Sequence, residues 1–197
     1  FSKFIEFNIL NDRGGNDLSR VQFSRVAWMP ELEGKTLKDW AVMRGIEPSV
    51  KNGAELVIEA ELNGGASCIF HAMDESDVEN IMKYPHTMIA SDGRLSEPGV
   101  GHPHPRAYGT FPRVLGRYVR EKKVISMSEA IYKMTYLPAK AFGLKNRGLI
   151  MKGMMADITI FDEEEIIDNA TFESPHQYPD GIKYVIINGE FAVDNFE

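Results

Sequence analysis

The stretch Thr87-Met88-Ile89-Ala90-Ser91-Asp92, with Gly93 after it, decides the fold that we expect for this chain. It is a short apolar run that ends at a carboxylate and enters a glycine- and proline-rich loop, which we place at residues 93–112. A strand that is buried on both faces has such a continuous apolar segment. In α/β folds, the carboxyl ends of these strands face the loops that hold the chemistry. The pattern therefore indicates an α/β fold with Asp92 at a functional edge.

The composition argues against several classes of partner. The 197 residues include 29 acidic and 22 basic side chains, and the resulting net charge of -7 disfavours a surface built for nucleic acid or anionic lipid. No run in the sequence approaches the ~20 apolar residues of a membrane-spanning helix. Cys68 is the only cysteine, so an intrachain disulfide is excluded, and its apolar neighbours indicate a buried structural thiol. These features are typical of a cytoplasmic protein.

Strand and helix signals alternate along most of the chain. Residues 36–39 resemble a capping box that opens a helix, and Ser126 with Glu129 forms a second one. Strand, helix, strand, loop and helix in succession is the rhythm of a parallel sheet covered by helices. We expect strands at residues 21–27, 66–71 and 87–92 and helices at residues 36–45, 49–62, 74–84, 114–120 and 126–137. Pro138 should end or restart the last helix, whose buried face we expect to be Ala130, Ile131, Met134 and Leu137.

The pattern changes near residue 148. Residues 156–162 alternate in the way a half-buried strand does. Residues 184–187 then meet residues 190–193 across Asn188-Gly189, which is the strongest short hairpin signal in the chain. We therefore expect a first part at residues 1–147 and a small, mostly β part at residues 148–197.

Several of these segments together resemble one enzyme family. The run from Asp92 through residues 104–116, and Lys133-Met134-Thr135-Tyr136-Leu137-Pro138-Ala139, look like the D-aminoacylases, the N-acyl-D-amino-acid deacylases of the amidohydrolase superfamily. Residues 26–28, 32–37 and 73–78 extend the likeness upstream, so that it covers most of the chain. Residues 148–162 are similar to the segment where superfamily members leave the barrel and rejoin a β-sandwich.

This resemblance implies the C-terminal part of a metal-dependent (β/α)8 barrel at residues 1–147, followed by strands of a β-sandwich side domain at residues 148–197. It also implies a zinc site at the mouth of the barrel, with Asp92 as a metal ligand and as general base and then acid. Zinc lowers the pKa of bound water from about 16 to about 7, and a neighbouring carboxylate can take that water's proton. The alternative for Asp92 is a turn or capping aspartate before Gly93.

Other side chains after Asp92 are candidates for binding the substrate. The planar fork of Arg106 can hold a substrate carboxylate, and a structural salt bridge is the alternative. His104 and Tyr108 are further candidates, with simple packing as the alternative. His102 and His104 have the spacing of a metal-binding pair, yet the superfamily's His-x-His pair follows an early strand. We therefore assign both histidines to supporting or packing roles in the loop.

The remaining cations and histidines are expected to be structural. We interpret Arg94, Arg113 and Arg117 as solvated or helix-pairing charges. His71 ends a predicted strand, where a hydrogen-bonded structural role is the simplest one. His176 belongs to the late β region and is remote from any metal-binding pattern.

The departure from the family is an absence, since the histidine and cysteine ligands of the family's zinc are expected upstream of Phe1. The leading hypothesis is that the parent protein hydrolyses the amide of an N-acyl-D-amino acid to a carboxylate and a D-amino acid, and that this chain alone is incomplete. The alternatives are a cyclic-amide hydrolase of the dihydropyrimidinase-like type and a non-catalytic fragment or assembly module. The expected partners are the small-molecule substrate and, over the apolar surface, either a homo-oligomer or the upstream segment of the same protein.

Overall fold

A computed structural model describes residues 2–195 of the chain. These residues divide into two units, and each is described by itself. Unit 1 contains residues 2–74 and 96–104, and unit 2 contains residues 75–95 and 105–195. Asp92 and Arg106 therefore belong to the same unit, although most of the residues between them belong to the other one.

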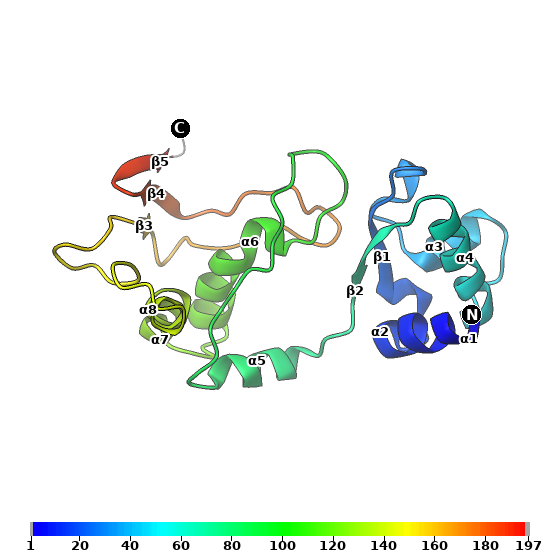
Figure 1. Ribbon diagram of the computed structural model, residues 1–197, viewed down its shortest axis with the longest axis horizontal. Helices are drawn as coiled ribbons and strands as arrows, with labels where there is room; N and C mark the ends of the chain where they lie inside the picture. The colour runs from blue at the N-terminus through cyan, green and yellow to red at the C-terminus, as the bar shows by residue number, and fades with distance from the viewer. Residues whose placement is uncertain (1, 196–197) are drawn as a thin grey trace. The chain divides into compact units, whose positions relative to one another are not determined.

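Unit 1 is mostly helical around a two-stranded sheet, and Figure 1 labels its elements. Its helices are α1 (Ser2–Ile5), the π-helix η1 (Glu6–Asn11), α2 (Asp12–Gly14), the 3-10 helices η2 (Leu18–Arg20) and η3 (Pro30–Leu32), α3 (Leu37–Met43) and α4 (Val50–Leu62). Its strands are β1 (Val21–Arg25) and β2 (Ser67–Phe70).

The two strands of unit 1 pair antiparallel, with Val21 opposite Phe70 and Phe23 opposite Cys68. Our expectation of a parallel sheet is wrong for this pair. A single crossover helix returns the chain to start a parallel strand, whereas here two helices, α3 and α4, lie between β1 and β2. The second helix reverses the chain once more, so the next strand runs the opposite way.

Both helices between the strands begin at caps that the sequence predicts. The Thr36 hydroxyl accepts a hydrogen bond from the Asp39 amide at 3.1 Å, and the Asp39 carboxylate accepts one from the Thr36 amide at 2.8 Å. The Ser49 hydroxyl accepts from the Asn52 amide at 3.3 Å. These bonds satisfy amides that a helix start leaves without partners, so the starts of α3 and α4 are set locally.

The core of unit 1 gathers around Trp40 of α3. The side chains of Val26, Leu32, Leu37 and Trp40 are at most 1% exposed. The Phe23 ring of β1 meets the Trp40 ring edge-on, with 5.7 Å between the centroids. Aromatic pairs of this geometry stabilise a core by more than the burial of their surface alone provides. The contact therefore holds the antiparallel strand pair against α3.

Unit 2 combines helices with a three-stranded antiparallel sheet in the order β3-β4-β5 (Figure 1). Its elements are α5 (Glu75–Lys83), α6 (Arg106–Arg113), the π-helix η4 (Val114–Glu121), α7 (Met127–Met134), α8 (Tyr136–Ala141), β3 (Ile158–Phe161), β4 (Ile182–Ile187) and β5 (Glu190–Asp194). The predicted hairpin is confirmed. Asn188 and Gly189 join β4 to β5 with φ angles of 52° and 88°, the positive values that this tight turn requires.

The predicted strand at residues 87–92 is wrong as a paired strand. Among residues 2–195, no strand pairs with this segment. The Thr87 amide donates to the Tyr84 carbonyl at 3.1 Å, and the Ile89 amide donates to the Lys133 carbonyl of α7 at 3.1 Å. An apolar run joins a sheet only where a second strand supplies its hydrogen-bond partners, and the described part of this chain offers a helix instead.

The loop that we expected at residues 93–112 ends earlier, because α6 begins at Arg106. The amides of Tyr108 and Gly109 both donate to the Pro105 carbonyl at 3.0 Å, and proline suits the start of a helix. Gly109 and Pro112 disfavour a helix in isolation. Both are buried here, so tertiary contacts outweigh their weak helix propensity.

The buried side of α7 differs in part from the expected one. The capping box is confirmed, since the Ser126 hydroxyl accepts from the Glu129 amide at 3.3 Å, and Pro138 lies inside the restarted helix α8. Ala130 is fully buried as expected, but Ile131 is 40% exposed and Lys133 is only 3% exposed. Residues 130 and 133 share one face of the helix, and this face, rather than the one through Ile131, meets the core.

The strands β3, β4 and β5 lie where the sequence predicts a β region, although turns and loops make up most of residues 148–195. The expected boundary between residues 147 and 148 falls within unit 2, and the division there stays a prediction. A closed barrel and a second sandwich layer also stay predictions, since the described residues form only the two small sheets.

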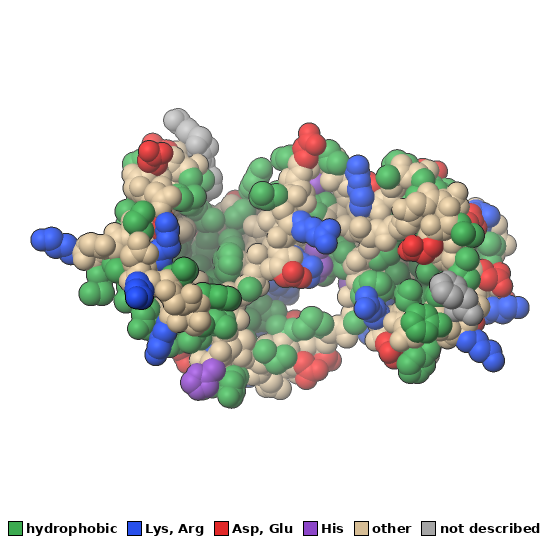
Figure 2. Space-filling view, in the orientation of Figure 1, with side chains coloured by type: hydrophobic (Ala, Val, Ile, Leu, Met, Phe, Trp, Pro, Cys, Tyr) green, Lys and Arg blue, Asp and Glu red, His purple; other side chains and the backbone are tan. Residues whose placement is uncertain are grey.

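Large apolar side chains are exposed in both units. Figure 2 shows them among the charged groups on one face of the molecule. In unit 1 the Leu62 side chain is 82% exposed, and in unit 2 the Phe142 and Ile150 side chains are 77% and 82% exposed. Such surfaces favour association with another chain or segment, which stays our prediction for them.

Candidate functional site

Asp92 lies at a close approach between two segments of unit 2. Its φ of 46° is left-handed, a conformation that aspartate adopts more readily than most non-glycine residues. A Cβ atom on Gly93 would lie 3.1 Å from the carbonyl oxygen of Arg106 and 3.2 Å from Cα of Ala107. Glycine at position 93 therefore lets the chain after Asp92 pass directly beside the start of α6.

Arg106 forms an ion pair with Asp92. Nη2 of Arg106 lies 2.8 Å from Oδ2 of Asp92, and the two side chains are 44% and 83% exposed. The structure thus brings together the two residues that the sequence analysis assigned to proton transfer and to substrate binding. It also shows the salt bridge that was the alternative for Arg106. An exposed ion pair contributes only about 0–1 kcal/mol to stability. The pair matters because it shows that the Arg106 guanidinium can reach a carboxylate beside the start of α6.

Tyr108, two residues further along α6, is held by aromatic neighbours. Its hydroxyl lies 2.9 Å from Nδ1 of His176, and its ring meets the Tyr178 ring edge-on with 5.4 Å between centroids. The Tyr108 hydroxyl therefore already has a polar partner within the chain. Its assignment to substrate binding stays a prediction, and the sequence analysis did not anticipate the contact with His176.

The helix that carries Arg106 is fixed on a segment about sixty residues later in the sequence. Nη1 of Arg113 lies 2.8 Å from Oδ2 of Asp168, whose side chain is 7% exposed. Burial lowers the pKa of the Arg113 guanidinium, but the hydrogen bond and charge of Asp168 outweigh this effect and the pKa is raised overall. Our interpretation of Arg113 as a solvated or helix-pairing charge is therefore wrong, since its partner is a buried carboxylate from outside the helix.

Two glycines allow this close packing. A Cβ atom on Gly109 would lie 2.6 Å from Cβ of Asp168, and one on Gly116 would lie 2.4 Å from the carbonyl oxygen of Ile166. The same carbonyl accepts a hydrogen bond from Nη1 of Arg120 at 2.7 Å. The position of Arg106 thus depends on a helix that is locked against residues 166–168 along two turns.

The histidines of unit 1 meet around a buried glutamine. Gln22 of β1 is 7% exposed, with its Oε1 3.1 Å from Nε2 of His71 and its Nε2 3.5 Å from Nε2 of His102. The His102 amide donates to the Ser24 carbonyl at 2.8 Å. His71 and His102 therefore contribute to internal packing of unit 1. His104 belongs to the same unit, whereas Asp92, Arg106 and Tyr108 belong to unit 2, and its assignment to substrate binding stays a prediction.

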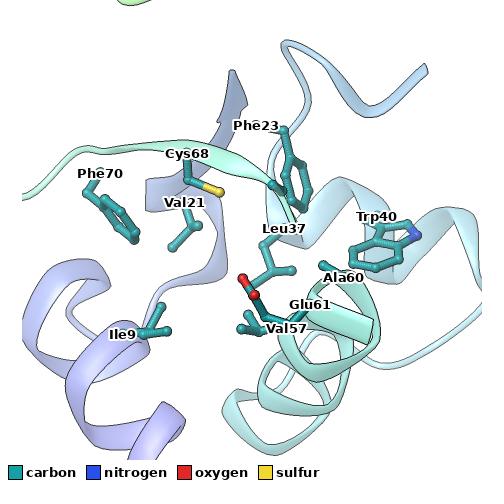
Figure 3. A pocket seen from close by; sticks show the side chains of 11 residues that line it. Ile9, Val21, Phe23, Leu37, Trp40, Val57, Ala60, Glu61, Cys68 and Phe70 are labelled. Atoms are coloured by element: carbon teal, nitrogen blue, oxygen red, sulfur yellow. The ribbon is translucent and has the colours of Figure 1, made fainter. Parts of the chain in front are cut away.

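An apolar cavity of about 210 Å³ lies between β1, β2 and the helices of unit 1 (Figure 3). Val21, Phe70 and Cys68 line it, and the carboxylate of Glu61 lies among these apolar side chains. Burial, and to a smaller degree the charge of Glu61, raise the pKa of the Cys68 thiol to about 11. The thiol therefore stays protonated at neutral pH and is inert, in agreement with a structural role.

The residues that the structure describes contain no complete set of zinc ligands. Within residues 2–195, no three histidine, cysteine, aspartate or glutamate side chains gather closely enough to hold a metal ion. Asp92 is a single carboxylate whose nearest charged partner is the guanidinium of Arg106. Zinc requires three or four N, S or O donors, so Asp92 is at most one ligand of a site completed by other residues.

No helix in the described part of the chain is long and apolar enough to span a membrane.

Comparison with known proteins assigns most of the chain to one family model, described as the amidohydrolase family, which matches residues 10–193. An N-acyl-D-glutamate deacylase of Alcaligenes xylosoxydans xylosoxydans is 39% identical over 168 residues, which are 84% of this chain and 32% of that protein. A D-aminoacylase of the same organism is 42% identical over 160 residues, which are 81% of this chain and 31% of that protein.

A solved structure gives the same result for the fold. The N-acyl-D-glutamate deacylase of Bordetella bronchiseptica, complexed with zinc and a phosphonate inhibitor that mimics the tetrahedral intermediate, matches with a TM-score of 0.77 and 35% identity. The match covers 89% of this chain and 35% of that one. The chain thus spans about a third of the length of the relatives that it matches.

Proposed function

Because the chain belongs to the amidohydrolase family, we propose that it is part of a hydrolase that cleaves the amide bond of N-acyl-D-amino acids. Relatives that match most of its length include deacylases of N-acyl-D-glutamate and N-acyl-D-aspartate and a D-aminoacylase. The observation that carries the proposal is the 2.8 Å contact between Asp92 and Arg106. It joins a proton acceptor to a group that recognises carboxylates, and the substrate class requires both.

Asp92 is the proton acceptor in this proposal. Its side chain is 83% exposed, so a water molecule and a substrate can reach it. A carboxylate beside an attacking water takes its proton as the water adds to the amide carbonyl. The same carboxyl group then returns a proton to the departing amine. This amine must be protonated, since an unprotonated nitrogen is a poor leaving group.

Arg106 recognises the carboxylate of the substrate. Every N-acyl-D-amino acid carries a carboxylate on the carbon next to the amide nitrogen. The fork of Arg106 already holds one carboxylate at 2.8 Å in the structure, and a guanidinium can bind such a group through two parallel hydrogen bonds. His104 and Tyr108 stay candidates for contacts with the rest of the substrate.

Zinc enters the proposal only for the complete protein. The Bordetella bronchiseptica relative is a zinc complex, but the described residues of this chain include no group of three side chains that could hold the metal, and Asp92 is the one ligand that we propose from them. The other ligands are proposed to come from the remainder of a protein as long as its relatives, in which residues 1–147 form the later part of a (β/α)8 barrel and residues 148–197 form part of a sandwich. That remainder, or a second copy of the chain, is proposed to cover the exposed apolar side chains.

The test is the Asp92→Asn substitution in the complete protein, assayed with an N-acyl-D-amino acid and with a hydantoin. Asparagine has a similar shape but accepts no proton, so turnover of the N-acyl-D-amino acid should fall by about 100-fold or more. Glu121→Gln makes the same chemical change at an exposed position at the end of η4 and should retain full activity. Near-normal turnover in the Asp92→Asn protein would contradict the role of Asp92, and a preference for the hydantoin would favour cyclic-amide hydrolysis instead.

A further inference from the structure

Lys133 of α7 is a buried cation with an unusual set of partners. Its side chain is 3% exposed. Nζ donates hydrogen bonds to the carbonyl oxygens of Tyr84 and Thr87, the second at 3.3 Å. Among the residues that the structure describes, Lys133 has no carboxylate within ion-pair distance. The ammonium group is therefore used to hold backbone rather than to balance a charge.

Burying an ammonium group is costly unless its donors are satisfied. A methionine would fill the same space without this cost, so packing alone does not explain a lysine at this position. The two carbonyl groups that it holds belong to the turn and the extended chain after α5. Removal of the donors would leave the Tyr84 carbonyl with only the Thr87 amide and would take the Lys133 donor from the Thr87 carbonyl, and the loss of such bonds favours local rearrangement.

The backbone of Lys133 binds the same segment. Its carbonyl oxygen accepts a hydrogen bond from the Ile89 amide at 3.1 Å. One residue of α7 thus makes three hydrogen bonds to residues 84–89, and the Ile89 side chain packs on the adjoining core. Residues 87–92 pair with no strand in the described part of the chain, and the contacts with Lys133 hold the segment instead.

We propose that Lys133 is a positioning residue for Asp92, and this inference rests on the proposed function of Asp92. Asp92 lies three residues beyond Ile89, so the extended chain between them spans at most about 10 Å. The next hydrogen bond along the segment, from the Gly93 amide to the Ser91 hydroxyl at 3.2 Å, is local and fixes nothing outside it. The three hydrogen bonds of Lys133 are therefore the anchor on the upstream side of Asp92, whereas the ion pair with Arg106 and the packing of Gly93 hold its downstream side.

The first experiment uses the 197-residue chain and does not depend on any activity. Amide hydrogen exchange is measured across residues 84–92 in the wild-type chain and in Lys133→Met. Exchange at Thr87 and Ile89 should accelerate by about 10-fold or more, because the segment opens more often once Nζ no longer binds the Tyr84 and Thr87 carbonyls, although the backbone acceptors of both amides remain. Lys140→Met, the same change at an exposed lysine, should leave exchange unchanged. Unchanged exchange in Lys133→Met would overturn the inference whether or not the chain is part of a deacylase.

The second experiment separates positioning from stability in the complete protein. Lys133→Met should lower kcat by about 100-fold, the effect of moving a reacting group by about 1 Å, while KM changes little because Arg106 lies on another helix. Ser126→Ala removes the cap of the same helix and should lower Tm without lowering kcat. Equal kcat losses in the two variants would show that Lys133 acts only through stability. If Lys133→Met does not fold, Lys133→Arg takes its place, because arginine keeps the cationic donors. This variant should retain both turnover and slow exchange. A loss of turnover in Lys133→Arg with unchanged exchange would overturn the proposal.

Discussion

Gly116→Ala should destabilise the chain, although alanine is normally the better helix residue. Gly116 lies in η4, where the helix passes over the backbone of residues 166–167. An added Cβ atom would lie 2.4 Å from the carbonyl oxygen of Ile166 and 2.7 Å from Cδ1 of Ile167. The Ile167 side chain can rotate away. The carbonyl cannot do so freely, because it also accepts the hydrogen bond from Arg120 at 2.7 Å.

The size of the effect follows from three contributions. Alanine gains about 1 kcal/mol over glycine within a helix. Forcing an extra methyl group into a packed interface costs about 1–3 kcal/mol. Displacing the Ile166 carbonyl weakens its charged hydrogen bond, which contributes about 1.5–3 kcal/mol. The free energy of unfolding should therefore fall by roughly 2–5 kcal/mol, which is a large share of the stability of a domain of ordinary size.

Urea unfolding followed by circular dichroism measures this difference, at several protein concentrations so that association can be recognised. Arg120→Met is the matched control, because it removes the hydrogen bond without adding a methyl group, and it should cost roughly 1.5–3 kcal/mol. A midpoint for Gly116→Ala at or above that of the wild-type chain would refute the close approach of η4 to residues 166–167.

Three further predictions concern the site and the thiol. Arg106→Lys in the complete protein should weaken binding of an N-acyl-D-amino acid more than binding of its amide, because lysine lacks the fork; equal relative losses would remove Arg106 from carboxylate recognition. The contribution of Cys68 to stability should be complete below about pH 9 and be lost as the pH rises to about 11, by up to roughly 2–3 kcal/mol, because the unfolded thiol ionises before the buried one. Cys68→Ala should lack this part of the loss. The 197-residue chain alone should retain no stoichiometric zinc after dialysis and show no deacylase activity. Stoichiometric zinc in elemental analysis, together with deacylase turnover, would contradict this prediction.

Local signals in the sequence predicted the starts of α3, α4, α5, η4 and α7 and the C-terminal hairpin, but not the helices before residue 21 or α6. The capping boxes at Thr36 and Ser126 and the Asn188-Gly189 turn each act within four residues, so no distant contact can change them. The direction of β2 was predicted wrongly. The sequence predicts two helices between β1 and β2, and this count implies an antiparallel pair; the rhythm of strands and helices alone suggested a parallel one.

The errors in the first part of unit 2 share one physical cause. Residues 87–92 are apolar enough for a buried strand, but a strand also needs a partner, and a partner is not encoded in the segment itself. The helix α6 contains Gly109 and Pro112, which normally argue for a loop. The side chain of Asp168 and the backbone of residue 166 lie where a larger residue would collide, and only the folded chain reveals this.

The candidate site was predicted in its residues but not in its contacts. Asp92 and Arg106 were identified separately, and their pairing depends on the glycine at position 93. Asp168 and Lys133 were missed, because a single aspartate in a polar stretch and a lysine on a helix resemble solvated charges. Only their burial distinguishes them, and burial depends on elements that are distant in the sequence.

The ion pair makes the proposed roles of Asp92 and Arg106 interdependent. A substrate carboxylate and the carboxylate of Asp92 are both attracted to the same guanidinium, so the substrate competes with an internal ligand that is already 2.8 Å away. Removing the charge of Asp92 should therefore strengthen substrate binding through Arg106 while it abolishes proton transfer. In a double-mutant cycle, Asp92→Asn should lower KM in the wild-type background and leave KM unchanged when Arg106 is already methionine, which has no charge to share. If instead the two substitutions change KM independently, Asp92 and the substrate do not share Arg106, and the ion pair has no part in recognition.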